Sequence, residues 1–112
     1  MTVDEFRSLA LAVPEAFESA HMGHADFRVG GKVFATLGYP DESYGMVKLT
    51  PEQQQSFMQK APGVFEPCSG AWGRGGATSV GLAAARVETL RGALVAASKN
   101  VASHAKKKKC HR

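Results

Sequence analysis

Cysteine is scarce in this chain of 112 residues, which contains only Cys68 and Cys110. Neither lies in a CxxC or histidine-rich pattern, so the sequence indicates neither a disulfide framework nor a zinc site. No apolar run approaches the roughly 20 residues that span a bilayer. The acidic start at Asp4 and Glu5 also lacks the basic and apolar regions of a signal peptide. We therefore expect a soluble protein of the reducing cytoplasm, with no metal and no cofactor.

Patterns that carry catalysis are also absent. Residues 72–76 are rich in glycine, but they lack the spacing of a phosphate-binding loop and lead into a predicted strand. His21 and His24 are three residues apart, and Gly23 argues against the helix that would bring both to one metal ion. Cys68 has no base near it in the sequence and is interpreted as a buried or loop thiol. We therefore expect no enzymatic activity.

Basic residues are few in the body of the chain and frequent at its end. Residues 1–98 hold 8 basic and 10 acidic residues, a net charge of −2, although the whole chain carries +4. The remaining basic residues are Lys99, Lys106, Lys107, Lys108, Lys109 and Arg112. The lysine run is interpreted either as a solubilising segment or as a nonspecific polyanion site. We expect residues 1–104 to form a single domain and residues 105–112 a flexible basic tail.

Hydrophobic periodicity predicts three helices and a sheet of short strands. We expect helices at residues 2–13, 50–60 and 83–104, and strands at 26–29, 32–37, 44–49 and 78–82. Residues 16–22 are interpreted as a connection, and residues 64–76 as short extended pieces with turns. The order α-β-β-β-α-β-β-α predicts an α+β domain with an antiparallel sheet and helices packed on one side.

Two local signals define element boundaries. Gly30 and Gly31 supply the positive φ angles of a two-residue hairpin turn. Thr50 is a cap with proline at the first helical position and glutamine three residues after it. After the hairpin, strict alternation predicts one face with Val33, Ala35 and Leu37 and another with Lys32, Phe34 and Thr36.

Several short motifs follow one another along the chain. They are His24, Phe27-Arg28-Val29-Gly30-Gly31-Lys32, Phe34-Ala35, Val47-Lys48-Leu49 before a Pro-Glu helix, Pro62-Gly63 and Trp72-Gly73. Together they resemble the MmcQ/YjbR family, over about residues 3 to 102. The resemblance implies a small α+β domain of the CyaY-like, secretion-chaperone-like kind. Members of that family are commonly described as DNA-binding, by analogy of the fold.

Basic and aromatic residues of the body are candidates for nucleic-acid binding. Arg28, Lys32 and Lys48 are expected near the hairpin, where they would contact phosphates if they share a face; the alternative is a solvated polar face. Trp72 beside Arg74 would stack a base and hold its phosphate, although a lone tryptophan is more often a core residue or pocket wall. The resemblance favours Lys48 and Trp72. With the lysine run, these residues predict a DNA-binding domain of low sequence specificity.

The second hypothesis is a domain that binds a small ligand or a protein. In it, His24, Phe34 and Trp72 line a shallow pocket and the charged residues face solvent. The position of the positive charge separates the two hypotheses, because a continuous stripe on the body favours nucleic acid and charge confined to the tail favours the pocket. We expect a monomer, with DNA or another polyanion as partner under the first hypothesis and no role at a membrane.

Overall fold

The computed structural model describes residues 1–21, 23–38 and 41–110, and the side chains of residues 1–20, 23–38 and 41–102. The helices are α1 (Val3–Leu11), α2 (Pro51–Lys60), α3 (Gly70–Arg74) and α4 (Val87–Cys110), with a short 3-10 helix η1 (Leu82–Ala84) before α4. The strands are β1 (Phe17–His21), β2 (His24–Val29), β3 (Lys32–Leu37), β4 (Tyr44–Lys48), β5 (Phe65–Pro67) and β6 (Ala77–Gly81).

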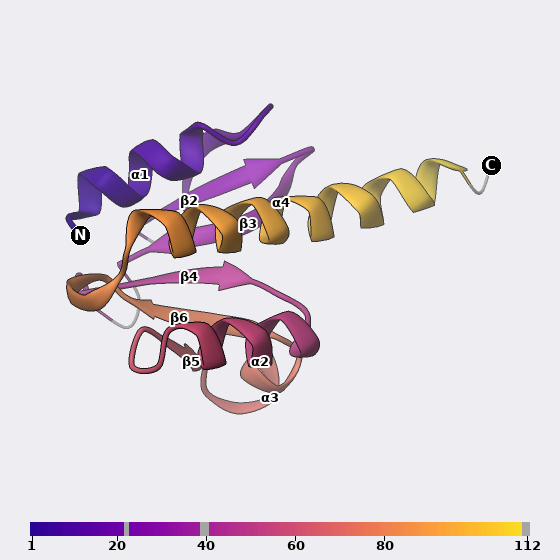
Figure 1. The fold of residues 1–112 in the computed structure, drawn as a ribbon. Coiled ribbons are helices and arrows are strands. Elements are labelled where there is room, and N and C mark those ends of the chain that lie inside the picture. Colours follow the sequence, from indigo (N-terminus) through magenta and orange to yellow (C-terminus); the bar gives the residue numbers. More distant parts are fainter. Residues whose placement is uncertain (22, 39–40, 111–112) are drawn as a thin grey trace.

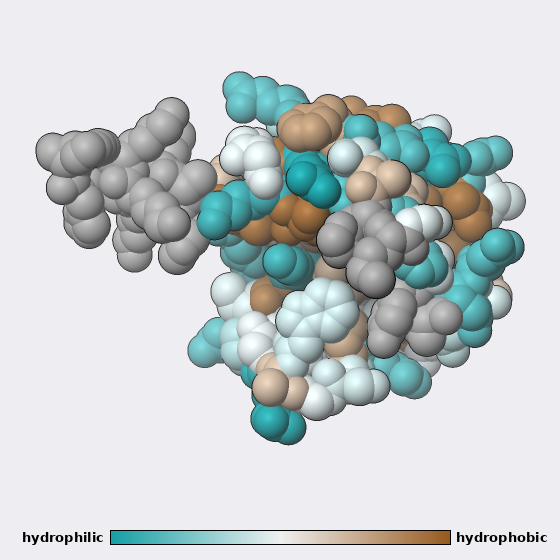
Figure 2. All heavy atoms as spheres, turned by 180° about the vertical axis from the view of Figure 1, so that it is seen from behind, coloured by the Kyte–Doolittle hydropathy of each residue, from teal (hydrophilic) through white to brown (hydrophobic). Residues whose placement is uncertain are grey.

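The strands form one antiparallel sheet in the order β1-β2-β3-β4-β6-β5. In Figure 1, α1, α4 and α2 lie in front of this sheet. The predicted α+β class, with helices on one side of an antiparallel sheet, is therefore confirmed. We call the side with these helices the covered face and the other side the open face. Figure 2 shows the molecule from behind, where hydrophilic and hydrophobic side chains are interspersed.

The strand register assigns side chains to the two faces, because residues directly paired in an antiparallel sheet lie on the same face. One row crosses all six strands on the open face and consists of Ser19, Asp26, Thr36, Met46, Ser79 and Glu66. The next row lies on the covered face and consists of Glu18, Phe27, Ala35, Val47, Thr78 and Pro67. Alternation from these two rows places the other strand residues.

The helices α1 and α2 each follow a threonine and begin with a capping box. The Thr50 hydroxyl accepts a hydrogen bond from the Gln53 N–H at 3.1 Å, and the Gln53 side chain accepts one from the Thr50 N–H at 3.0 Å. Thr2 and Glu5 make the same pair of bonds at the start of α1. Each box gives a hydrogen-bond acceptor to two backbone N–H groups that have no partner within the helix. The predicted start of α2 is confirmed.

The first half of the sheet consists of two consecutive hairpins. Gly30 and Gly31 have φ angles of +62° and +80°, as the predicted turn between β2 and β3 requires. The interpretation of residues 16–22 as a connection is wrong, because Phe17 to His21 form β1 and pair with β2. β1 is an edge strand, so its alternation is only half constrained by the core.

The predicted alternation along β3 is wrong at Phe34. Phe27 of β2 pairs with Ala35, whereas the next residue, Arg28, pairs with Val33. This β-bulge leaves Phe34 as an extra residue in β3, so that Phe34 and Ala35 are both fully buried in the core.

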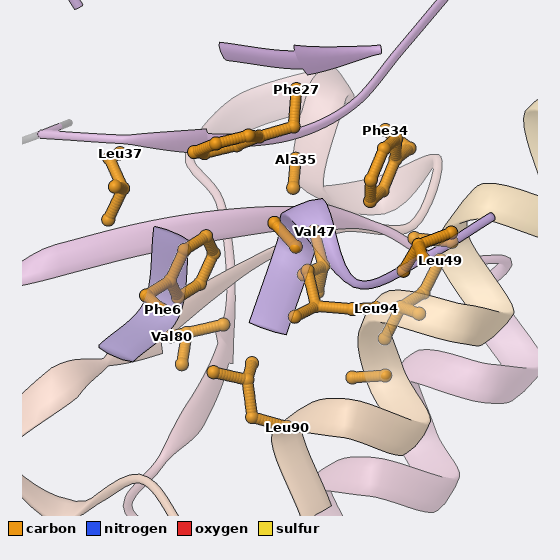
Figure 3. Packing of buried hydrophobic residues seen from close by; sticks show 14 of the residues in the cluster. Phe6, Phe27, Phe34, Ala35, Leu37, Val47, Leu49, Val80, Leu90 and Leu94 are labelled. Carbon is orange, nitrogen blue, oxygen red and sulfur yellow. The ribbon is translucent and has the colours of Figure 1, made fainter. Parts of the chain in front are cut away.

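The core fills the space between the covered face and the helices α1 and α4. Phe6 of α1 and Leu90 and Leu94 of α4 are fully buried against strand residues. Figure 3 shows these side chains meeting Phe27, Phe34, Ala35, Leu37, Val47, Leu49 and Val80 in one layer. Gly45 of β4 makes room for Phe6, since a Cβ at this position would lie 2.7 Å from the Phe6 ring.

Two predicted helical boundaries differ from the structure. Within residues 64–76, β5 is extended as predicted, but residues 70–74 form the short helix α3. α4 begins at Val87, after η1, and continues to Cys110 instead of ending near His104; in Figure 1 its C-terminal part extends beyond the sheet. The division into a domain and a flexible tail stays a prediction. Within the part of the chain that the structure describes, no helix is long and apolar enough to cross a membrane.

Candidate nucleic-acid interface

Five basic residues that are far apart in the sequence lie at one end of the sheet. The β2–β3 hairpin and the antiparallel pairing of β3 with β4 bring the start of β3 and the end of β4 to the same end. β6 begins there, because Lys48 pairs with Ala77, and α4 reaches it, because the Asn100 side chain donates a hydrogen bond to the Lys48 carbonyl at 3.0 Å. We call this set the basic end: Arg28, Lys32, Lys48, Arg74 and Lys99.

The opposite end of the sheet carries acidic residues. The β3–β4 connection supplies two of them and the first turns of α1 and α4 supply the others. These helix starts lie at this end because the Met1 ammonium donates a hydrogen bond to the carbonyl of Leu82, at the end of β6, at 3.0 Å. We call this set the acidic end: Asp4, Glu5, Asp41, Glu42 and Glu88. Glu15, which precedes β1, and Glu52 also lie at the basic end. Arg7, which pairs with Asp4, lies with Arg86 and Arg91 near the acidic end, so the separation of charge between the two ends is partial.

The strand residues of the basic end do not all share a face. Arg28 and Lys48 lie on the open face, by alternation from the row that contains Asp26 and Met46. Lys32 pairs with Val29, whose side chain is buried on the covered face, because the bulge shifts the register of β3. The structure therefore brings Arg28 and Lys48 to one face, and Lys32 extends the same end on the other face.

Arg28 differs from the lysines because it already has an anionic partner. Its Nε and Nη2 atoms donate hydrogen bonds to the two Asp26 carboxylate oxygens at 2.9 and 3.1 Å. The Asp26 side chain is 2% exposed, while that of Arg28 is 29% exposed. The hydrogen bond to Asp26 raises the pKa of Arg28, with desolvation opposing and the carboxylate charge adding to this effect. The bidentate pair thus offsets one positive charge of the basic end.

Trp72 lies on α3 beside the basic end, and 49% of its surface is exposed. α3 is held very close to the neighbouring backbone. A Cβ at Gly73 would lie 1.7 Å from the Cys68 carbonyl oxygen, and one at Gly76 would lie 2.0 Å from that of Leu49. Glycine at these two positions is therefore what allows α3 to pack at the start of β6.

Gln54 of α2 holds α3 through a buried amide. The side chain is 6% exposed, and its Nε2 donates hydrogen bonds to the carbonyls of Gly73 and Ala77 and to the Thr78 hydroxyl at 3.0, 3.1 and 3.1 Å. Sequence reasoning missed this residue. The available signal was its position three residues before Phe57, on the inward stripe of α2, where a polar residue needs a partner.

The three residues of the pocket hypothesis are not brought together. Phe34 is fully buried in the core. His24 starts β2 at the opposite end of the strands from α3 and lines a cavity of about 450 Å³ with Arg7, Leu37 and Glu42 among others. Trp72 lies at the basic end. The structure therefore places His24, Phe34 and Trp72 in three separate environments.

Cys68 is partly buried beside β6, where its Sγ lies 3.8 Å from the Ser79 Oγ. Burial raises the pKa of the Cys68 thiol, and the contact with the Ser79 hydroxyl lowers it by less. A raised pKa keeps the sulfur protonated near neutral pH, which makes it a poor nucleophile. Among the described residues, no three histidine, cysteine or carboxylate side chains gather where they would hold a metal ion.

The predicted lysine run follows the basic end along α4. The α4 backbone continues past Asn100, which contacts the basic end, to Cys110. The side chains of Lys106, Lys107, Lys108 and Lys109, like Arg112, lie outside the described residues.

The fold and this end of the sheet define a small α+β domain with one helix-covered face and a basic end. Residues 11–98 match the model of the YjbR family, and the chain belongs to this family. The resemblance to MmcQ/YjbR proteins is thereby confirmed. A crystal structure of a Deinococcus radiodurans protein with a DUF419 domain has a similar fold, with a TM-score of 0.72, 21% sequence identity, and coverage of 89% of this chain and 78% of that chain. A search of curated proteins finds no match.

Proposed function

We propose that the protein binds nucleic acid, DNA included, at its basic end, through phosphate contacts that do not depend on base sequence. The observation that carries this proposal is the convergence, at one end of the sheet, of cations from β3, β4, α3 and α4 that have no ion pair among the described residues. Phosphate contacts position a nucleic acid without reading its sequence. The acidic end would repel the phosphates of the same ligand. We therefore expect the sugar-phosphate backbone of the nucleic acid to contact the basic end and not the acidic end.

Binding without catalysis is the second part of the proposal. Two observations support it: the Cys68 thiol has a raised pKa, and the Arg28 guanidinium is occupied by Asp26. A thiol that stays protonated is a poor nucleophile, and a guanidinium engaged by a carboxylate is less available to stabilise charge that develops on a substrate.

The test compares two double variants of the full chain that change the net charge equally. Lys32→Glu with Lys99→Glu alters exposed residues of the basic end, and Lys60→Glu with Arg91→Glu alters exposed residues elsewhere. Fluorescence anisotropy with a labelled DNA across a salt series measures affinity and its salt dependence. We expect the first variant to weaken binding at least about tenfold at low salt and to reduce the slope of log K against log salt by about 2.

The second variant is expected to retain the salt slope of the unaltered chain. Equal weakening by both variants would show that binding follows net charge alone, and would overturn the assignment to the basic end. Absence of binding to any nucleic acid at low salt would overturn the function itself. Two duplexes of unrelated sequence should bind with equal affinity.

A further inference from the structure

The exposed aromatic residues of the described chain lie at the basic end. The large hydrophobic side chains that are exposed are Val3, Leu11, Phe17, Trp72 and Val87. Phe17 starts β1 and pairs with Arg28, so it lies on the open face next to that arginine. Trp72 lies on α3, at the start of β6. Exposing 48% of a phenylalanine and 49% of a tryptophan at the same end, with no benefit to the core, calls for an explanation from binding.

Two aromatic residues flank two basic residues across this end of the sheet. Phe17 lies on β1, Arg28 on β2, Lys48 on β4 and Trp72 beside β6, which follows β4 in the sheet. With strands about 4.8 Å apart, the distance from β1 to β6 is about 19 Å. A chain of several nucleotides would extend over this distance, with cations between two aromatic rings. Proteins that bind single strands combine cations for the backbone with aromatic rings for the bases in this way.

The support of Trp72 is rigid. Gln54 fixes the carbonyl of the adjacent Gly73, and the closeness of Gly73 to Cys68 leaves no room for α3 to shift. A side chain on a backbone held from both sides loses less entropy when a ligand stacks on it. This rigid support favours a binding role for Trp72, since a half-exposed indole contributes little to the stability of the fold.

We infer that the basic end prefers single-stranded nucleic acid, with unpaired bases stacking on Trp72 and Phe17 while Lys48 and its neighbours contact the phosphates. This inference rests on the proposed function and adds the class of ligand. Paired bases in a duplex are stacked on one another and leave no ring face for Trp72. DNA and RNA single strands offer the same ring faces and phosphates, so both belong to the class.

The experiment uses the full chain and three probes: oligothymidylate, oligouridylate and a DNA duplex of equal length. Trp72 is the only tryptophan of the chain, so its emission reports stacking directly. We expect both single strands to quench this emission and to bind more tightly than the duplex. Trp72→Ala and Phe17→Ala should each weaken single-strand binding about 5- to 100-fold and leave duplex binding nearly unchanged.

Trp72→Phe keeps a ring and should restore most of the affinity, while Val87→Ala, a similarly exposed residue at the acidic end, should have no effect. Circular dichroism and thermal melting confirm that each variant is folded. Equal affinity for duplex and single strand, with no effect of the aromatic variants, would overturn this inference and leave the proposed function in place. Loss of binding to all three probes by the unaltered chain would overturn both.

Discussion

The two ends of the sheet differ in how their charges are explained by the fold. At the acidic end, Asp4 and Glu5 occupy the first turn of α1 and Glu88 that of α4, where negative charge stabilises a helix. Asp41 accepts a hydrogen bond from the Ser43 N–H at 2.7 Å within the β3–β4 connection. Four of the five acidic residues of this end, all but Glu42, therefore have local structural roles.

Apart from Arg74, which lies in the last turn of α3, the free cations of the basic end have no comparable explanation. Within the described residues, the side chains of Lys32, Lys48, Arg74 and Lys99 take part in no ion pair, whereas Arg28 pairs with Asp26. Four cations without anionic partners repel one another and add nothing to the core. Charge without an anionic partner at one end, and charge with local structural roles at the other, is what the proposed binding at the basic end would lead us to expect.

The largest expected effect comes from disrupting the close contact between Gly73 of α3 and the Cys68 backbone. In Gly73→Ala, the new Cβ meets the Cys68 carbonyl oxygen at 1.7 Å, so α3 must move away from the sheet. We expect a loss of about 3 kcal/mol in the free energy of unfolding, measured by urea denaturation. Because Trp72 lies on α3, single-strand binding should fall as well.

The matched control lies two residues further on. In Gly75→Ala, the nearest atom is the Trp72 carbonyl oxygen at 3.5 Å and the backbone is in the right-handed helical region. This change should be neutral or stabilising by up to about 1 kcal/mol. Equal destabilisation by the two variants would contradict a specific close contact at Gly73.

The next effect concerns the amide that joins α2 to α3. Gln54→Ala removes the donor for the Gly73 and Ala77 carbonyls and for the Thr78 hydroxyl, all of them buried. We expect a loss of about 1 to 3 kcal/mol in the free energy of unfolding. The neighbouring Gln55→Ala alters an exposed residue and should change it by less than about 0.5 kcal/mol. Similar values for both would show that the three bonds contribute nothing net.

Releasing Arg28 would sharpen the contrast between the two ends. Asp26→Asn removes the carboxylate that offsets the guanidinium, so the basic end gains one free cation. We expect DNA binding at low salt to tighten about threefold, with a salt slope steeper by about 1, and stability to fall by about 1 to 2 kcal/mol. Glu42→Gln changes the net charge equally, because it removes one exposed carboxylate at the acidic end. It should leave the slope unchanged, and an equal gain from both would argue against a local site.

The smallest effect is on cysteine reactivity. Because burial raises the pKa of Cys68, its thiolate forms at a higher pH in the folded chain than in the unfolded one. In a Cys110→Ser background, alkylation of Cys68 between pH 7 and 10 should therefore reach its half-maximal rate at higher pH before urea is added than after. Identical pH profiles would show that burial in the folded chain does not shift the pKa of Cys68.

The features of the fold that are most predictable from the sequence are those that depend on neighbouring residues alone. The Gly30-Gly31 turn and the Thr50 capping box act within four residues, so their geometry follows from neighbouring side chains alone. β1 was missed because an edge strand needs only one apolar face, and Phe17 is not even buried. α3 was missed because a helix of five residues with two glycines depends on its contacts with the sheet.

The candidate site was predicted in its residue types and not in its arrangement. Lys32, Lys48 and Arg74 were recognised as basic residues near the hairpin or the tryptophan, but whether they share a face depends on the register of β3. That register depends on the bulge at Phe34, which places this ring in the core between the sheet and the helices. Phe17 and Gln54 act through tertiary pairing, and no pattern of spacing reveals such partners.

The bulge in β3 also has a consequence for comparing this chain with its relatives. Residues 35–37 of β3 follow one alternation between the two faces, and residues 32–33 follow the opposite alternation. Phe34 is the extra residue between them. A relative with a regular strand would align with both halves only if a single gap were placed opposite Phe34. Placed in the Gly30-Gly31 turn, where gaps are usually put, it would match Lys32 and Val33 each to a residue on the opposite face of the sheet.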